Sequence, residues 1–266
     1  MKFGIVSDEI DRDFATAVRV GKAVGIERYE IRGLKSGRAP MCDAAELLEV
    51  ERIAAGEGVE ITALSPGLFK MTDDEAGFRY AMDEVYPKAA ELALGWGLPG
   101  LIVFGFHKPG ATEENFRALE AAPVPEQVVD WFALAVARAA GDGLALMVEP
   151  EPICWIDTST AAAQLGLRIN YDAGNVAWLL QRDPIDEFDV AAPWIANVHV
   201  KDWLPHRFVP AGQGLINYRA HFAALRRAGY KGPISLEPHM DGSLETIRAC
   251  KQALEQSYES DATSGD

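Results

Sequence analysis

The chain has 266 residues, of which 48% are hydrophobic and 24% are charged, and its formal net charge is −15. Its length is close to the roughly 250 residues of a single (β/α)8 barrel, and no apolar run approaches the ~20 residues of a membrane-spanning helix, so we expect no membrane partner. The acidic charge opposes binding to a polyphosphate backbone, which needs clustered Lys and Arg, and a nucleic-acid partner is therefore not expected.

Short β-like runs alternate with amphipathic helical stretches along the whole chain, which indicates repeated βα units and a parallel sheet. The predicted strands cover residues 3–7, 28–32, 60–64, 100–106, 144–149, 168–172, 195–200 and 233–237. The predicted helices cover residues 13–23, 44–55, 78–94, 125–139, 159–165, 176–181, 218–228 and 244–255. This succession predicts an α/β fold, a single (β/α)8 TIM barrel over residues 1–256, with a flexible tail over residues 257–266.

Glycine and proline residues add local signals to this prediction. Pro87 lies inside the third predicted helix, so we expect a kink or two shorter helices there. The segment Gly212-Gln213-Gly214 lacks the spacing of a phosphate-binding loop and is predicted only to shape the loop before the next helix. Six glycines stand where predicted helices should end: Gly25, Gly58, Gly97, Gly143, Gly166 and Gly229.

The cysteines and the N-terminal segment bear on the cellular compartment. Cys42, Cys154 and Cys250 lie far apart, without the spacing of a disulfide framework or a zinc ribbon, so we expect reduced and mostly structural thiols. The first residues, MKFGIVSDEI, predict a strand rather than a secretory signal. A cytoplasmic location is therefore expected.

The alternation of side chains along each strand identifies residues that point into the barrel. In such a barrel every second residue faces the interior, and active sites lie at the carboxyl ends of the strands. The last inward residues of strands five to eight are Glu149, Asp172, His199 and Glu237. The same alternation predicts that Ile195 also faces inward and Ala196 outward.

Because these strand ends meet at one face of the barrel, the four side chains are expected to converge. Three uncompensated carboxylates would repel one another, so we predict a divalent cation among them. Oxygen-rich ligation with one imidazole favours Mn²⁺, with Mg²⁺, Co²⁺ or Zn²⁺ as alternatives. Taken singly, Asp172 could instead cap the following helix, and His199 could be an ordinary core residue.

Five sequence segments carry a resemblance to a known family. The runs LMVEPEP, INYDAGN, NVHVKDW, AGQGLINY and GPISLEPH, in this order, resemble the xylose isomerase-like TIM-barrel superfamily, which contains sugar phosphate isomerases and epimerases. The resemblance covers nearly the whole chain, and its latter half is the specific part. It implies that Glu149, Asp172, His199 and Glu237 bind the metal, the same four residues that strand alternation selects.

The resemblance also implies a reaction. It points to a divalent-metal-dependent sugar isomerase or epimerase that acts through a metal-bound enediolate on a small ketose or related polyol. Glu149 and Glu237 would be the catalytic acid and base, one on either face of the sugar. The alternative is a dehydratase (lyase) of an inosose- or dehydroshikimate-like substrate on the same metal site. The resemblance is also compatible with a homodimer.

Two further readings are weaker. Endonuclease action on abasic DNA occurs on this fold but needs more than the five His present, and the net charge opposes it. A non-catalytic binding role would predict partner binding that depends on metal without any turnover.

Several other residues are candidate substrate contacts. His107 follows strand four with inward parity, with a loop-anchoring role as the alternative; Glu151 lies two residues beyond Glu149, with helix capping or solvent exposure as the alternative. Asn175 could equally begin a helix, and Lys201 could instead form an ion pair with Asp202. Two tryptophans in the loops after strands five and seven could cover a sugar face or simply pack: Trp155 and Trp203.

Overall fold

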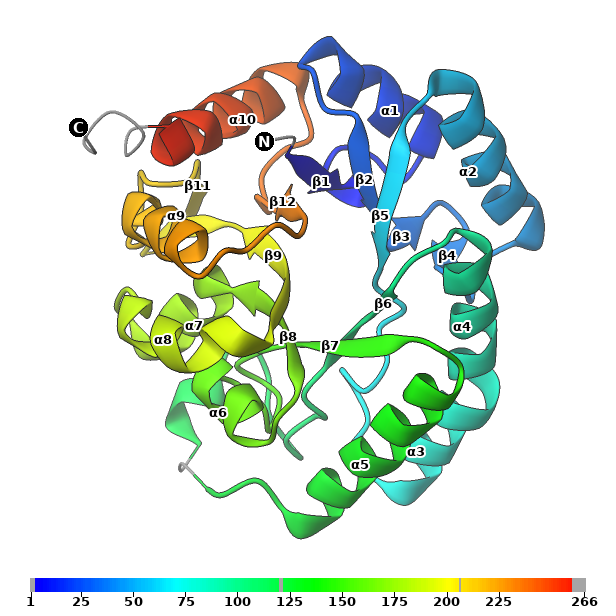
Figure 1. Ribbon diagram of the computed structural model, residues 1–266, viewed down its shortest axis with the longest axis vertical. Coiled ribbons are helices and arrows are strands. Elements are labelled where there is room, and N and C mark those ends of the chain that lie inside the picture. Colours follow the sequence, from blue (N-terminus) through cyan, green and yellow to red (C-terminus); the bar gives the residue numbers. More distant parts are fainter. Residues whose placement is uncertain (1–2, 120–121, 206, 260–266) are drawn as a thin grey trace.

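The computed structural model describes residues 3–119, 122–205 and 207–259. Eight parallel strands form a nearly closed barrel that is surrounded by helices (Figure 1), which confirms the predicted fold class. The barrel strands are β1 (Gly4–Val6), β2 (Arg28–Ile31), β5 (Glu60–Leu64), β6 (Gly100–Phe104), β7 (Ala145–Glu149), β8 (Arg168–Asp172), β9 (Ile195–Val200) and β12 (Ile234–Leu236). Each of them lies within one of the predicted strand ranges.

The first and last barrel strands pair with each other, which closes most of the cylinder. The order is β5-β2-β1-β12-β9-β8-β7-β6, and every described pairing is parallel. Between β5 and β6 the described residues form no strand pairing, but the Phe104 amide donates to the Leu68 carbonyl at 3.0 Å. The loop after β5 therefore bridges the seam.

The helices occupy the outside of the barrel (Figure 1). They are α1 (Phe14–Ala23), α2 (Ala44–Glu57), α3 (Glu75–Tyr80), α4 (Tyr86–Gly95), α5 (Glu126–Gly141), α6 (Ser159–Gln164), α7 (Ala173–Leu180), α8 (Phe188–Ala191), α9 (Tyr218–Arg227) and α10 (Leu244–Glu259). The third predicted helix is divided as expected, because a π-helical turn (Ala81–Val85) separates α3 from α4 and Pro87 is the second residue of α4. All six glycines expected at helix ends have positive φ.

The predicted start of the C-terminal tail is wrong. Helix α10 continues to Glu259, Ser257 is buried, and Tyr258 packs edge-on against Phe3 and Phe222. These apolar contacts hold the last helical turn against the barrel. Residues 260–266 lie outside the described part of the chain.

The barrel interior contains a small apolar layer below the polar strand ends. Ala63, Ile102 and Met147 form this layer, and Ala196 packs against it, whereas Ile195 packs in the outer core between strands and helices. The expected orientation of these two β9 residues is therefore reversed. Strand β9 has one extra residue between two consecutive pairings with β8, and such a bulge shifts the alternation by one position.

Two short hairpins that the sequence did not predict extend from the carboxyl ends of barrel strands. One joins β3 (Gly33–Leu34) to β4 (Gly37–Arg38), and the other joins β10 (Asp202–Leu204) to β11 (Arg207–Val209). Both bring polar side chains to the catalytic face expected of a barrel. No helix of the described residues is long and apolar enough to cross a membrane.

Candidate active site

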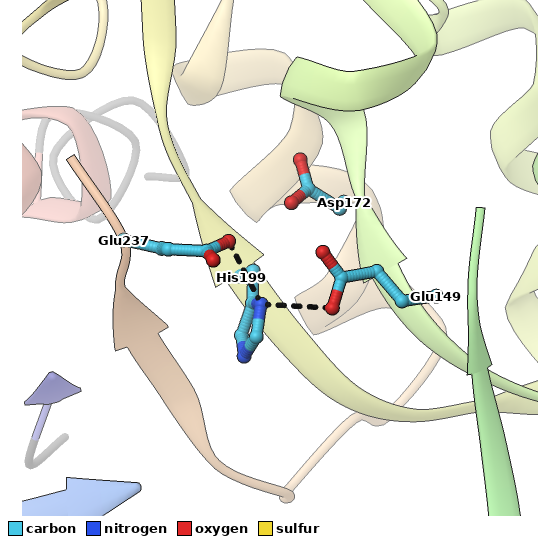
Figure 2. A group of neighbouring side chains, drawn as sticks. All are labelled: Glu149, Asp172, His199 and Glu237. Atoms are coloured by element: carbon cyan, nitrogen blue, oxygen red, sulfur yellow. Dashed lines mark ion pairs between the residues drawn. The ribbon is translucent and has the colours of Figure 1, made fainter. Parts of the chain in front are cut away.

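Four side chains from the ends of consecutive barrel strands meet in one buried cluster. One potential ligand atom from each of Glu149, Asp172, His199 and Glu237 lies within 4.8 Å of the others (Figure 2). The imidazole Nδ1 of His199 lies 3.1 Å from Glu237 Oε2 and 3.5 Å from Glu149 Oε2. The convergence expected from strand alternation is therefore present, and all four side chains are at most 4% exposed.

His199 is oriented by a carboxylate on the opposite side of its ring. Its Nε2 lies 2.7 Å from Oε2 of Glu30, a buried residue of β2. With Nε2 donating to this carboxylate, Nδ1 faces Glu149 and Glu237 and would offer its lone pair to a cation that displaces its proton, an arrangement typical of metal-ligating histidines. Burial disfavours a charged imidazole, but the surrounding carboxylates outweigh it and raise the pKa of His199 well above its usual value.

The two carboxylate oxygens of Asp172 have different surroundings. Oδ1 accepts a hydrogen bond of 3.0 Å from the backbone amide of Asn175 and so caps helix α7. Oδ2 is buried and lies 2.8 Å from Lys201 Nζ, yet accepts no well-directed hydrogen bond within the described residues. Burial raises the pKa of Asp172 to about 6, although the ammonium of Lys201 opposes this shift. Helix capping and site formation are thus both realised, each by one oxygen.

Glu237 follows β12 and contacts two cations. Its Oε2 lies 2.8 Å from Lys201 Nζ, and its Oε1 pairs with Nη1 of Arg32. Burial opposes ionisation, but Lys201, His199 and Arg32 outweigh it and hold the pKa of Glu237 well below its usual value. Glu237 is therefore ionised near neutral pH.

Lysine and arginine side chains already neutralise part of the carboxylate charge, whereas the prediction from the sequence treated the carboxylates as uncompensated. Lys201 lies between Asp172 and Glu237, and Arg32 also pairs with Glu9 and with Asp8. Carboxylates still outnumber the fixed cations around the cluster, since two cations face Asp8, Glu9, Glu30, Glu149, Asp172 and Glu237. Residual negative charge, which favours a bound cation, remains at the site.

Amide side chains below the cluster hold the carboxylates in place. Asn170 donates to Glu149 Oε2 at 3.0 Å, and Asn197 donates to Glu30 Oε1 and to Asn170 Oδ1 at 3.0 Å each. Asn175 donates to Glu149 Oε1 at 3.1 Å. Both oxygens of Glu149 therefore have fixed directions before any ligand binds.

The cluster forms part of the wall of a cavity that opens at the strand ends. This inner cavity has a volume of about 90 Å³ and is lined by cluster residues and by cations, among them Glu149, His199, Glu237, Arg32, Arg38 and Lys70. An outer vestibule shares Lys70, Glu151 and His239 with it and adds Asn175, Trp178, Trp203, Arg207 and Phe208. The inner cavity and the adjoining vestibule, which is about 570 Å³, together offer space for a small polar molecule.

Three of the predicted substrate contacts lie at this cavity or vestibule. Glu151 lines both and pairs with Lys70 at 2.5 Å. Asn175 and Trp203 line the vestibule, and the Asn175 side chain also holds Glu149 and the Pro150 carbonyl. Their positions are compatible with substrate contact, which stays a prediction.

The other three predicted contacts, His107, Trp155 and Lys201, do not line the cavity or the vestibule. His107 is buried with Nε2 3.0 Å from the Ala111 carbonyl, and Trp155 packs against the outer core, so loop anchoring and packing account for both. The ion pair with Asp202, the alternative to substrate contact for Lys201, is wrong, because Lys201 turns inward and pairs with Asp172 and Glu237. Asp202 instead accepts hydrogen bonds from four backbone amides: Trp203, Gly212, Gly214 and Ile216.

Sequence reasoning missed several residues of the site. Glu30 and Arg32 have inward parity on and just after β2, so the test applied to strands five to eight would have found them. Glu9, Arg38 and Lys70 lie in a 3-10 turn, a hairpin and a loop, where side chains follow no alternation. No local signal could have placed them at the cavity.

The donor set fits a divalent cation. Three carboxylates and one oriented imidazole surround a common point, and the buried Oδ2 of Asp172 lacks a well-directed donor among the described residues. Oxygen-rich ligation of this type suits Mg²⁺ or Mn²⁺, and imidazole also suits Zn²⁺. The site is thus a candidate metal centre, and the metal remains to be identified.

Comparison with known families identifies the fold family of the chain. Residues 18–259 match the family described as the xylose isomerase-like TIM barrel. The chain belongs to this family. The resemblance found in the sequence motifs is thereby confirmed, and it extends over most of the barrel.

Individual relatives of this xylose isomerase-like barrel are more distant. The L-ribulose-5-phosphate 3-epimerase UlaE of Shigella flexneri is 35% identical over 86 residues, which are 30% of this chain and 30% of that protein. Among solved structures, the probable 3-DHS dehydratase AsbF of Bacillus anthracis has a TM-score of 0.73 and 19% identity, covering 96% of this chain and 99% of that one. A xylose isomerase-like protein of Mycobacterium smegmatis in complex with magnesium has a TM-score of 0.69 and 18% identity, covering 93% and 88%.

Proposed function

We propose that this protein is a divalent-metal-dependent sugar isomerase or epimerase that acts on a small ketose or related polyol. The observation that carries the proposal is the convergence of Glu149, Asp172, His199 and Glu237 in the wall of a cavity that, with its vestibule, offers space for a small molecule. The partial similarity to a named sugar-phosphate 3-epimerase supports the reaction type. We propose a manganese ion as the preferred cofactor.

The residues of the cluster are placed for proton exchange on two sides of a substrate. A divalent cation held by the four side chains would supply Lewis-acid stabilisation of an enediolate. Glu149 and Glu237 come from strands β7 and β12, with β8 and β9 between them, and lie on opposite sides of His199 in Figure 2. One of the two groups, as the carboxylate, removes a proton from a substrate carbon, and the other, as the carboxylic acid, donates a proton to that carbon.

The surrounding residues keep these carboxylates directed at the cavity. Asn170 and Asn175 hold Glu149, while Arg32 and Lys201 hold Glu237. Fixed donors of this kind cost no rearrangement during the reaction. We assign Glu149 and Glu237 as the acid/base pair on this basis.

A dehydratase is the second candidate, supported by the similarity in fold to a probable 3-DHS dehydratase. The same proton removal beside a carbonyl can expel a β-hydroxyl instead of being reversed. The fold is compatible with both outcomes, so the reaction has to be read from products.

The test is a metal-supplemented screen of ketoses, their phosphates and inososes, followed by NMR in D₂O. Deuterium uptake at one carbon without loss of water would support the isomerase or epimerase, whereas loss of water would select the dehydratase. If no substrate shows deuterium exchange or loss of water with Mn²⁺, Mg²⁺, Co²⁺ or Zn²⁺, the proposal is rejected.

Light scattering on the same sample tests the predicted homodimer.

A further inference from the structure

Arg38, at the end of the β3–β4 hairpin, lines the same inner cavity as Glu149, His199 and Glu237. Its Nε donates to the Ser65 carbonyl and its Nη2 to Ser65 Oγ, each at 2.9 Å. These two bonds use one edge of the planar guanidinium. The end formed by Nη1 and Nη2 keeps N–H groups that bind no described residue.

The other Lys and Arg side chains at the cavity or at the cluster behind it all pair with carboxylates. Arg32 pairs with three of them, Lys70 pairs with Glu151 at 2.5 Å, and Lys201 pairs with Asp172 and Glu237. Arg38 forms no ion pair within residues 3–119, 122–205 and 207–259, so it is the cavity cation whose charge stays unmatched there. Burial and the charge of Arg32 lower the pKa of Arg38, while the carboxylates of Glu149, Asp8 and Glu237 oppose this shift.

The surroundings of Arg38 fix its position. Gly67 has φ +80°, and a Cβ at this residue would lie 2.9 Å from both Cδ and Nε of Arg38, so the absence of a side chain makes room for the guanidinium. The Phe104 ring also lies near the guanidinium, with its centroid 5.7 Å from Arg38 Cζ and 4.8 Å from Lys70 Nζ. Arg38 is thus a positioned group and not a freely moving surface cation.

We propose that Arg38 binds an anionic oxygen group of the substrate, either a carboxylate or a phosphate. The sugar carbons of the same substrate would then lie at Glu149, His199 and Glu237. The free end of a guanidinium matches two oxygens of such a group and forms paired, charge-assisted hydrogen bonds. Lys70 lies over the same Phe104 ring but is already paired with Glu151, so Arg38 is the group left to bind the anion. The inference rests on the proposed function, because it extends the substrate of that site from a neutral sugar to an acidic one.

The kinetic test compares three substrate classes on the Mn²⁺-loaded protein: a free ketose, its phosphate, and a ketose that carries a carboxylate. Arg38→Gln should raise KM and lower kcat/KM for one acidic class by about 10- to 100-fold, the range expected for lost hydrogen bonds to a charged group, while the free ketose is unaffected. The class that shows the loss identifies the anion. Arg52→Gln, at an exposed position of α2 away from the cavity, is the matched control and should leave this preference unchanged.

Arg38→Lys keeps the charge without the planar fork and should retain part of the preference for the acidic ketose. If Arg38→Gln fails to fold, Arg38→Lys takes its place in the kinetic comparison of the three substrate classes. An equal loss for free and acidic ketoses, or no loss for any class, would overturn the assignment of Arg38.

A binding measurement separates this inference from the proposed function. Calorimetry with inorganic phosphate and with acetate on chelator-treated protein reports the Arg38 site without any turnover. If one anion binds wild type but not Arg38→Gln, and no ketose reacts, the proposed function fails while Arg38 stands. If ketoses react but neither anion binding nor substrate preference depends on Arg38, the inference fails and the function stands.

Discussion

At the scale of single residues, the cluster is built from side chains that present one atom to the protein and another to the cavity. His199 gives Nε2 to Glu30 and faces the other ligands with Nδ1. Asp172 caps helix α7 with Oδ1 and leaves Oδ2 at the cluster. This division fixes the direction of each donor atom, so a cation would find its ligands already oriented.

The contact between Glu30 and His199 leads to a prediction about metal affinity. Glu30→Gln keeps an acceptor for Nε2 but removes the negative charge, so the imidazole becomes a poorer ligand. We expect Mn²⁺ affinity to fall about 10- to 100-fold, measured by competition with a chelator. Glu60→Gln, at an exposed position on the neighbouring strand β5, is the control. Unchanged affinity in Glu30→Gln would remove Glu30 from the site.

The role of Glu237 gives a second prediction at this scale. Glu237→Gln preserves shape but loses the proton-accepting carboxylate, and we expect turnover to fall at least ~100-fold, the lower range for a lost acid/base group. Circular dichroism should show an intact barrel. Turnover is measured with the substrate identified in the screen, against Glu60→Gln. Full activity in Glu237→Gln would refute its assignment as acid or base.

At the scale of elements, the strand ends deliver the cluster and the hairpins shape its surroundings. The β10–β11 hairpin and the loop after it are held by Asp202, whose Oδ1 accepts from Trp203 and Ile216 and whose Oδ2 accepts from Gly212 and Gly214. A Cβ at Gly214 would lie 2.3 Å from Asp202 Oδ1, so glycine is needed for this approach. The predicted loop-shaping role of Gly212-Gln213-Gly214 is confirmed.

The four amides around Asp202 predict a stability effect confined to this element. Asp202→Asn replaces one accepting oxygen by a donor, so one pair of amides loses its partner and the free energy of unfolding should fall by about 1–3 kcal/mol. Urea denaturation measures the loss, and hydrogen exchange should speed up at Gly212 or Gly214. Asp189→Asn, at an exposed position of α8, is the control. Equal stability and exchange in both variants would contradict this account.

At the scale of the whole molecule, the cluster joins strands from the first and last parts of the chain. Glu30 from β2 contacts His199 from β9, and Arg32 contacts Glu237 after β12. Any ligand that binds the cluster therefore stabilises the closed barrel, because it holds together segments that separate on unfolding.

This linkage predicts a change in thermal stability with metal. Mn²⁺ at a hundred times its Kd should stabilise the native state by about 2.7 kcal/mol, which corresponds to an increase in Tm of about 5–10 °C for a chain of this size. Calorimetry in chelator and in Mn²⁺ measures the shift, and Glu237→Gln should show a smaller one. Identical melting in both conditions, with no metal bound, would argue against the metal centre.

The order of the elements and the identity of the four cluster residues followed from the sequence. Both depend on local properties: hydrophobic periodicity locates each strand, glycines end the helices, and alternation decides which side chains face inward. Since the carboxyl ends of parallel strands always share one face, residues far apart in the chain could be assigned to one site without knowing any distance.

The tertiary structure alone decided how these residues are partnered. The inward turn of Lys201, the contact of Glu30 with His199, and the reversal of Ile195 and Ala196 depend on the register between neighbouring strands, including a bulge in β9. The arrival of Arg38 at the cavity depends on the path of a hairpin. Strand register and loop paths are set by packing between distant segments, so a local sequence pattern does not predict them.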